Sequence, residues 1–332
     1  MSVSLVGLRI MRATSESGYM TKMANAHAIR PMRLDDLGAV VELLMETSVL
    51  DIRPRLFDRL TECDDEKANI AIVAERNGMV IGAAKLTTEP AFPGTVSGLV
   101  AVAEAARGRG IGTELAGMLV EHLEQGDVES ATCAVRDDVT SGREFAERFG
   151  FVVTNHSMGW RHDLSNRLSE LLARTAYAVD VAQVQIRFAE PVAEKAAVTE
   201  LIRKCMAGLP VPSGNVHGFD PGRDDHLIPD GARVVLAEAR DGFNRTCGVT
   251  ILAPETNIDA WHINFAGVDP GYRRRGVAGA LMSASLLDAW QMGVREVTLV
   301  NDDSNEAIVR LCQRLGMKRT AGYWSLARPR DL

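Results

Sequence analysis

The sequence predicts a mixed α/β fold made of two tandem units, each with a mixed central sheet flanked by helices. Strand-like alternating stretches interleave with stretches of helical spacing along all 332 residues. In addition, segments of the first half recur in the second at a constant offset of 166 residues. The matched pairs include Gly110 and Gly276, Leu115 and Leu281, Thr132 and Thr298, and Gly150 and Gly316. A fixed period kept over several elements indicates internal duplication.

Composition narrows the class of protein. A formal charge of −7 argues against nucleic acid as the main partner, because phosphate neutralisation needs a basic surface. No apolar run approaches the roughly 20 residues of a membrane span, so we expect no membrane partner. The five cysteines are widely spaced, with no Cys-x-x-Cys pair and no His-Glu-x-x-His motif. These features favour a reduced cytoplasmic chain without a metal, and they leave the oligomeric state open.

The repeat divides the chain into four parts. We expect a loose N-terminal tail, a first domain, a linker helix and a second domain. Their ranges are 1–26, 27–163, 164–183 and 184–332. The linker should be helical and packed against a domain, because it has few breakers and carries Leu164, Leu168, Leu171 and Leu172.

Elements of the first domain follow from periodicity and turn residues. A short strand at 29–31 precedes a helix that Asp35 or Asp36 caps and that runs to Leu44. Asn77-Gly78 between two alternating stretches predicts a hairpin. Helices are further expected at 54–63, 111–124 and 141–149, and strands at 70–74, 80–87, 96–102, 130–135 and 151–161, the last closing the unit.

The second domain repeats this order with one addition. Helices are expected at 192–206, 277–291 and 305–314, and strands at 186–187, 234–239, 247–252, 262–268 and 296–300. Residues 209–231 hold four of the twelve prolines and four glycines, which predicts a long loop. Its charged and histidine side chains either attract a cationic amine or are merely solvated. They are His217, Asp220, Asp224, Asp225 and His226.

The most informative stretch is 261–281. Its strand ends in Asp269-Pro270-Gly271, three arginines follow, and a helix begins near Gly276. A helix start leaves backbone N–H groups unpaired and carries about half a positive charge, which suits an anion. The arginines strengthen that preference for a phosphate ligand. Residues 99–115 contain a second copy of this stretch.

The spacing of these loops resembles that of a known family. Arg273-x-x-Gly276-x-Ala278 and Arg107-x-x-Gly110-x-Gly112 fit the pattern Gln/Arg-x-x-Gly-x-Gly/Ala. This pattern is similar to the acyl-CoA pyrophosphate loop of the GNAT superfamily of N-acetyltransferases. The resemblance covers about residues 28–163 and 184–329. The tandem arrangement is similar, in architecture alone, to the mycothiol synthase branch of that family.

The resemblance implies acetyl-CoA as the acyl donor, held by backbone donors of the strand, by the loop and by one asparagine. In the second half the implied contacts are Ala266, Gly267, Val268, Arg273, Arg274, Arg275, Gly276, Val277, Ala278, Gly279 and Asn305. In the first half they are Val100, Ala101, Val102, Arg107, Gly108, Arg109, Gly110, Ile111, Gly112 and Thr113.

The resemblance also implies two catalytic positions in the second half. His262 stands where the family often has a glutamate base, and unperturbed imidazole titrates at about pH 6.5. By the two-residue period of a strand, residues 262, 264, 266 and 268 should share one face. Cys312 stands where the family has a tyrosine acid; it is either an acid or a buried structural cysteine, in which case solvent or Tyr323 supplies the proton.

The first half has lost these side chains. Val96, Val139 and Ala146 stand in place of His262, Asn305 and Cys312. We therefore expect an acetyl-CoA-dependent N-acetyltransferase with a catalytic C-terminal half and a small primary amine as acceptor. The alternatives are a protein or peptide amine as acceptor, a different acyl group such as succinyl, and a non-enzymatic tandem domain that binds or senses acyl-CoA.

Overall fold

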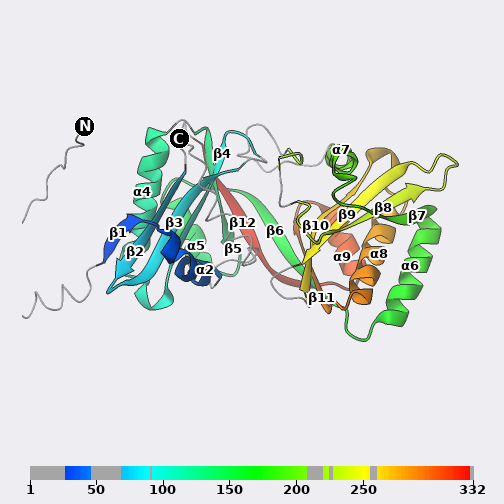
Figure 1. Cartoon of the computed structure of the whole chain (residues 1–332), viewed down its shortest axis with the longest axis horizontal. Helices are drawn as coiled ribbons and strands as arrows, with labels where there is room; N and C mark the ends of the chain where they lie inside the picture. Colours follow the sequence, from blue (N-terminus) through cyan, green and yellow to red (C-terminus); the bar gives the residue numbers. More distant parts are fainter. Residues whose placement is uncertain are drawn as a thin grey trace, which may run out of the picture.

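The computed structural model describes residues 27–45, 69–89, 92–126, 128–207, 220–223, 227–254 and 260–329. Figure 1 shows two α/β halves joined by a pair of long strands. Several sequence-based expectations fall outside the described residues. These are the tail 1–26, the helix 54–63, and, from the long loop, His217, Asp224, Asp225 and His226.

The elements of the N-terminal half follow the expected order. Asn77 and Gly78 have φ values of +52° and +77°, as a tight hairpin turn requires. Asp36 lies just ahead of α2 and accepts the backbone N–H of Arg33 at 2.7 Å. The strands are β1 (Ala28–Pro31), β2 (Ile70–Arg76), β3 (Met79–Thr88), β4 (Thr95–Val102), β5 (Ser130–Arg136) and β6 (Val152–Asp163). The helices are α2 (Leu37–Met45), α4 (Ile111–Gln125) and α5 (Thr140–Glu147).

The C-terminal half begins after the linker helix α6 (Leu168–Ala182). Its strands are β7 (Val184–Ala189), β8 (Arg233–Ala239), β9 (Thr246–Pro254), β10 (Ala260–Val268), β11 (Glu296–Asp302) and β12 (Lys318–Pro329). Its helices are α7 (Lys195–Met206), α8 (Val277–Gln291) and α9 (Glu306–Arg314). The expected mixed α/β class is confirmed.

The strands of both halves form one sheet of twelve, in the order β1-β2-β3-β4-β5-β12-β6-β11-β10-β9-β8-β7. The last strand of each repeat therefore lies in the other half: β12 pairs with β5, and β6 pairs with β11. The two strands also pair antiparallel with each other. The expectation that residues 151–161 close the first half is wrong, because the strand partners there come from the second repeat.

Two glycines permit the close crossing of β6 and β12. A Cβ on Gly159 would lie 2.0 Å from the carbonyl oxygen of Ala321, and one on Gly322 would lie 1.9 Å from that of Ser157. The register of the two strands shifts between Thr320 and Tyr323, at the same place. Main chain thus occupies the space that any side chain would need.

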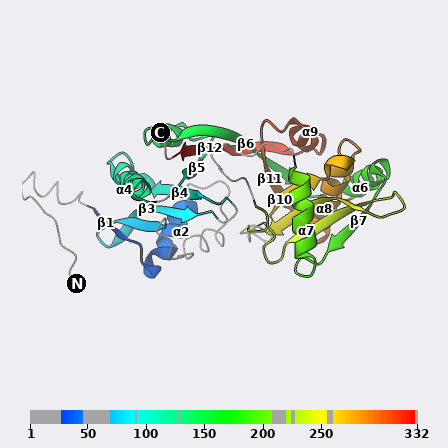
Figure 2. The ribbon, with the colours of Figure 1, turned by 90° about the horizontal axis from the view of Figure 1, so that it is seen from above.

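Helices cover both faces of the sheet in each half (Figure 2). In the N-terminal half, α4 and α2 pack against separate cores on opposite faces. In the C-terminal half, α8 and α9 lie over one face and α7 over the other. The linker helix α6 packs along α8, where the Thr175 hydroxyl donates to the carbonyl oxygen of Ser283 at 3.1 Å.

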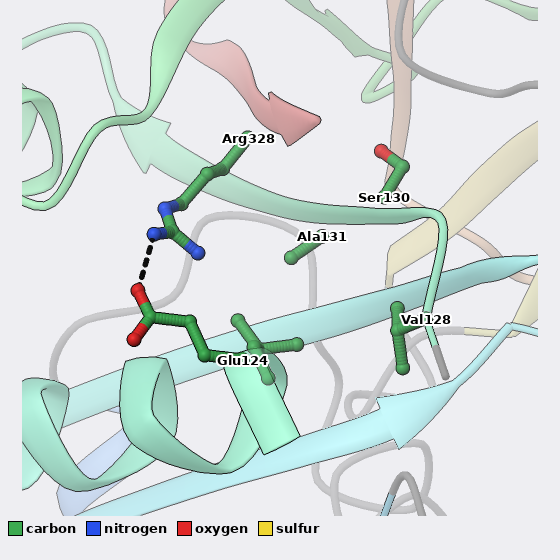
Figure 3. A pocket seen from close by; sticks show the side chains of 6 residues that line it. Glu124, Val128, Ser130, Ala131 and Arg328 are labelled. Atoms are coloured by element: carbon green, nitrogen blue, oxygen red, sulfur yellow. Dashed lines mark hydrogen bonds and ion pairs between the residues drawn. The ribbon is translucent and has the colours of Figure 1, made fainter. Parts of the chain in front are cut away.

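The end of β12 is also tied to the first half by an ion pair. Arg328 Nη2 lies 2.8 Å from Glu124 Oε1 at the C-terminal end of α4 (Figure 3). Beside this pair is a cavity of about 160 Å³, lined by Leu123, Glu124, Val128, Ser130, Ala131 and Arg328. The cavity lies at the opposite end of α4 from the glycine-rich loop.

The strand crossing makes a test of the exchanged sheet. Gly322→Ala should lower the free energy of unfolding by about 3 kcal/mol, because the new methyl group overlaps a backbone carbonyl that cannot move without breaking the sheet. Gly117→Ala is the control, since Gly117 lies within α4 with nothing within 4 Å of its added Cβ. It should raise that free energy by about 0.5–1 kcal/mol. Urea unfolding measures both, and equal midpoints would refute the crossing geometry.

Candidate functional site

Strands β10 and β11 part in the middle of the C-terminal half. They pair in parallel only from Ala260 and Glu296 to Ile263 and Leu299. The pairing of β10 with β9 has a bulge between Ile263 and Phe265, at Asn264. A bulge bends the strand and leaves one residue out of the ladder. Backbone groups on the β11 side of residues 264–268 therefore face a gap between the strands.

The bulge corrects one expectation about this strand. Ala266 and Val268 pack against the core beneath α8, together with Ile263. Asn264 instead donates its Nδ2–H to the carbonyl oxygen of Leu227, and Phe265 packs with that residue in the core beneath α7. Residues 262, 264, 266 and 268 thus do not share a face, because the extra residue reverses the alternation. The sequence carried a signal of this change, because the adjacent apolar residues Phe265 and Ala266 interrupt the alternation of the strand.

The loop after β10 exposes the start of α8. Gly276 is the residue before the helix, with φ at +86°, and no side chain caps the helix. Arg274 is also left-handed, with φ at +62°, a conformation that costs a non-glycine residue about 1 kcal/mol. The first helical N–H groups therefore point outward from a strained turn. Such a turn is suited to a phosphate group.

The three arginines of this loop do different work. Arg273 donates from Nε to the carbonyl oxygen of Val268 at 3.1 Å, and from Nη2 to those of Cys205 and Ala207 at the end of α7. It fixes the loop to the strand and to α7. Arg274 and Arg275 are exposed, so their charges are available to a ligand.

The linker helix reaches this loop. A Cβ on Gly276 would lie 3.6 Å from Cβ of Ala182 and 3.8 Å from Val181 Cγ1, both at the last turn of α6. One side of the Gly276 loop is therefore formed by the linker helix α6. Sequence reasoning missed this contact, because helical periodicity shows that a helix packs but not where its end lies.

The N-terminal half has the same loop geometry without the same surroundings. Gly108 and Gly110 have φ values of +72° and +84°, and an added Cβ at either would meet nothing within 4 Å. Arg107 donates to the carbonyl oxygen of Val102 at 3.0 Å, as Arg273 does to Val268. However, Glu114 adds a negative charge to the first turn of α4, where His27 lies 3.0 Å from it.

The first half also lacks the bulge. Strand β4 pairs with β3 in continuous register from Val96 to Val102. It parts from β5 after Ser97, so a gap between the strands is present in this half too. Val96, at the position of His262, is buried. The first half therefore keeps a glycine-rich loop and a gap but has neither the bulge nor a titratable side chain at that position.

His262 is half-buried at the last part of the paired stretch of β10 and β11. Its Nδ1 lies 2.7 Å from the hydroxyl oxygen of Thr298, its register partner on β11. The hydroxyl fixes the plane of the ring beside the point where the strands part. His262, Thr298 and Asn264 thus surround the start of the gap on the side of α7.

Asn305 and Cys312 lie on α9 in different environments. Asn305 precedes the helix and accepts the backbone N–H of Ile308 at 3.4 Å. Cys312 is fully buried in the core beneath α8, and burial raises the pKa of its thiol to about 12. A fully buried thiol with a pKa raised to about 12 is a poor proton donor, which argues against the acid role and favours the structural alternative.

Tyr323, the other side chain considered as an acid, lies on the exchanged strand β12. It is opposite Ser157 of β6, which in turn is opposite Asp302 of β11. Burial raises the pKa of Tyr323 and the Asp302 carboxylate raises it further, while a hydrogen bond with Ser157 lowers it. The tyrosine is thus protonated at neutral pH. Its strand, β12, is separated from β11 by β6.

Among the described residues, no group of three or more His, Cys, Asp and Glu side chains could hold a metal ion. Within the same residues, no helix is both long and apolar enough to cross a membrane.

The sequence matches a protein-family profile described as "Acetyltransferase (GNAT) family" in two regions, residues 37–151 and 197–317. Together these regions make up more than half of the chain, and each holds one glycine-rich loop. No curated protein matches the sequence.

Solved structures share the tandem architecture. A GCN5-related N-acetyltransferase from Sphaerobacter thermophilus is 18% identical, with a TM-score of 0.67, over 91% of this chain and 95% of that one. A tandem GNAT protein from the clavulanic acid biosynthesis pathway is also 18% identical, with a TM-score of 0.68, over 92% and 99%. An acetyltransferase described as putative, from Pyrococcus horikoshii, is 15% identical, with a TM-score of 0.57, over 91% and 89%. These similarities establish the fold.

The environment of Cys312 is testable by alkylation. At pH 8 the native protein should leave Cys312 unmodified by iodoacetamide, because burial blocks the reagent and keeps the thiol neutral. The denatured chain should be fully labelled at this residue. Peptide mass spectrometry reads both states. Rapid native labelling of Cys312 would instead show a thiol that opens to the gap.

Proposed function

This chain belongs to the GNAT family of acetyltransferases, and from that premise we propose that its C-terminal half transfers an acetyl group from acetyl-CoA to a small primary amine. The observation that carries the proposal is the bulge at Asn264, at the point where β10 parts from β11. His262 precedes the bulge and the Gly276 loop follows it. The N-terminal half has a similar loop and gap, but its β4 pairs with β3 without a bulge and has Val96 at the position of His262.

The pantetheine arm of acetyl-CoA would enter the gap beside residues 266–268. Backbone N–H groups of this part of β10 would donate to the pantetheine amides and to the thioester oxygen, which carries negative charge in the transition state. The pyrophosphate would lie at the Gly276 turn on the uncapped first turn of α8. Arg274 and Arg275 would balance its charge, and Asn305 would contact the cofactor from the start of α9.

His262 would remove the proton from the attacking ammonium group, directly or through one water. When its Nδ1 donates to Thr298, the basic nitrogen is Nε2, which cannot carry a proton in the same neutral tautomer. The amine nitrogen then forms a bond to the carbonyl carbon and loses its second proton to solvent. Collapse of the tetrahedral intermediate breaks the carbon–sulfur bond and yields the neutral amide and CoA thiolate.

The leaving CoA thiolate would not be protonated by Cys312, which is buried. Solvent or Tyr323 would supply the proton, since Tyr323 is protonated and lies on β12, which β6 separates from β11. The acceptor is proposed to be small because a formal charge of −7 does not favour a nucleic acid as partner.

The function is tested by turnover of acetyl-CoA with a panel of small amines, amino acids and peptide N-termini, followed by thiol release. We expect turnover with one class of small amine. Turnover with peptides alone would point to a protein acceptor. Tight binding of acetyl-CoA without turnover on any amine would make the chain an acyl-CoA sensor.

The two glycine-rich loops provide a matched pair. Gly276→Val should raise the KM for acetyl-CoA at least tenfold, because valine is strained at positive φ and meets the last turn of α6. Gly110→Val carries the same backbone strain in the other half and should leave turnover largely intact. Equal loss of activity in both variants would contradict the division of labour between the halves.

Calorimetry with CoA should show two sites of unequal affinity in the wild type.

The role of His262 is tested by His262→Ala. If it is the base, kcat should fall by about 10²–10⁴, with little change in the affinity for acetyl-CoA. The acidic limb of the pH–rate profile should disappear in the variant. Steady-state kinetics over pH measures both effects. Wild-type kcat with the acidic limb still in place would make His262 structural. The base would then be His217 or His226 of the loop 209–231, or Glu255, which precedes β10 in the sequence; all three lie outside the described residues.

A further inference from the structure

The loop between β11 and α9 is held by a strand of the other repeat. This loop, residues 302–305, ends at Asn305, the proposed CoA contact. Just before the loop, Trp160 of β6 donates its indole N–H to Asn301 Oδ1 at 2.6 Å. Within the loop, the backbone N–H of Asp303 donates to the carbonyl oxygen of His156 at 3.0 Å. Both partners come from the exchanged strand of the N-terminal repeat.

The side chain of His156 adds a second contact to the same loop. Its Nδ1 lies 2.8 Å from Asp303 Oδ2, and its Nε2 lies 3.2 Å from Asp137 Oδ2. The ring also stacks on Trp324 of β12, with 4.0 Å between ring centroids. It is therefore fixed on both edges and on one face.

Asp137 and Asp303 are equivalent residues of the two repeats, since each follows the last residue of β5 or β11. The backbone N–H of Asp137 donates to the carbonyl oxygen of Gly322 on β12, as that of Asp303 donates to His156 on β6. One imidazole thus bridges the corresponding loops of both halves. Gly322, the equivalent of His156 on the other exchanged strand, supplies no side chain.

We propose that His156, although part of the N-terminal repeat, is a positioning residue for acyl-CoA in the C-terminal half. Through Asp303 it fixes the turn that places Asn305 at the start of α9. This inference rests on the proposed function, because it assigns the Asn305 loop to the cofactor. It goes beyond that function, because it makes the C-terminal cofactor site incomplete without the other repeat.

The two ring nitrogens allow a matched pair of substitutions. In His156→Asn the amide nitrogen takes the place of Nδ1 and keeps the contact with Asp303. In His156→Gln the amide nitrogen takes the place of Nε2 and keeps only the contact with Asp137. His156→Ala removes both. All three variants retain the backbone hydrogen bond with Asp303, so the Asn and Gln variants differ only in which side-chain contact of His156 they keep.

We expect the KM for acetyl-CoA to rise about tenfold in His156→Gln and His156→Ala, the effect of one charge-assisted hydrogen bond, while kcat changes little. His156→Asn should restore a KM close to that of the wild type. Thermal midpoints of the Asn and Gln variants should agree within about 4 °C, which separates positioning from a general loss of stability. An equal KM in the Asn and Gln variants overturns the proposal.

Hydrogen exchange makes the test independent of turnover. The backbone amides of residues 304–309 should exchange faster in His156→Gln than in His156→Asn, because only the Gln variant loosens the turn. Equal exchange in the two variants also overturns the proposal. If the wild-type protein lacks turnover but the two variants still differ in exchange, the proposed function is refuted, while the contact between His156 and Asp303 is shown to hold this loop.

Discussion

The main-chain pairing of β6 with β12 is the interaction on which the rest of the structure depends. It converts two sheets into one of twelve strands and gives each half its last strand from the other repeat. Because Gly159 and Gly322 leave room only for backbone, the crossing has a single register on either side of the shift. Both gaps between strands, and both loops that follow β5 and β11, are positioned relative to this crossing.

Upon this shared frame the two halves differ in a few places. Both have a left-handed glycine before the helix and a gap between parallel strands. Only the second has the bulge and His262, and only the first places Glu114 at the start of its helix. The proposed function accordingly places the chemistry in the second half and a weaker site for the same kind of ligand in the first. They are local changes that the common sheet tolerates without any change of fold.

Local patterns predicted most of the fold and one part of the site. Helical spacing gave the bounds of α8, and the repeated Arg-x-x-Gly pattern located both glycine-rich loops, because turn residues and helix starts depend on neighbouring residues. The strand exchange could not be predicted. The closing strands β6 and β12 would show the same alternation of apolar and polar residues whether each paired within its own repeat or with the other repeat. The contact of Ala182 with the Gly276 loop depends on packing between distant segments, which periodicity does not encode. The Asn264 bulge did leave a sign in the sequence, because the adjacent apolar residues Phe265 and Ala266 interrupt the alternation of the strand.

The linker helix α6 gives the strand exchange a meaning beyond this chain. Without it, two copies of a single repeat joined in the same way would be a twofold-symmetric dimer that swaps its last strand. Here the covalent connection turns that association into an intramolecular one, so the exchange does not depend on protein concentration. The two repeats also need not be identical in sequence, as the subunits of a homodimer must be. Each repeat can accumulate its own substitutions, and asymmetry of the kind seen at Asn264 and Glu114 becomes heritable within one gene.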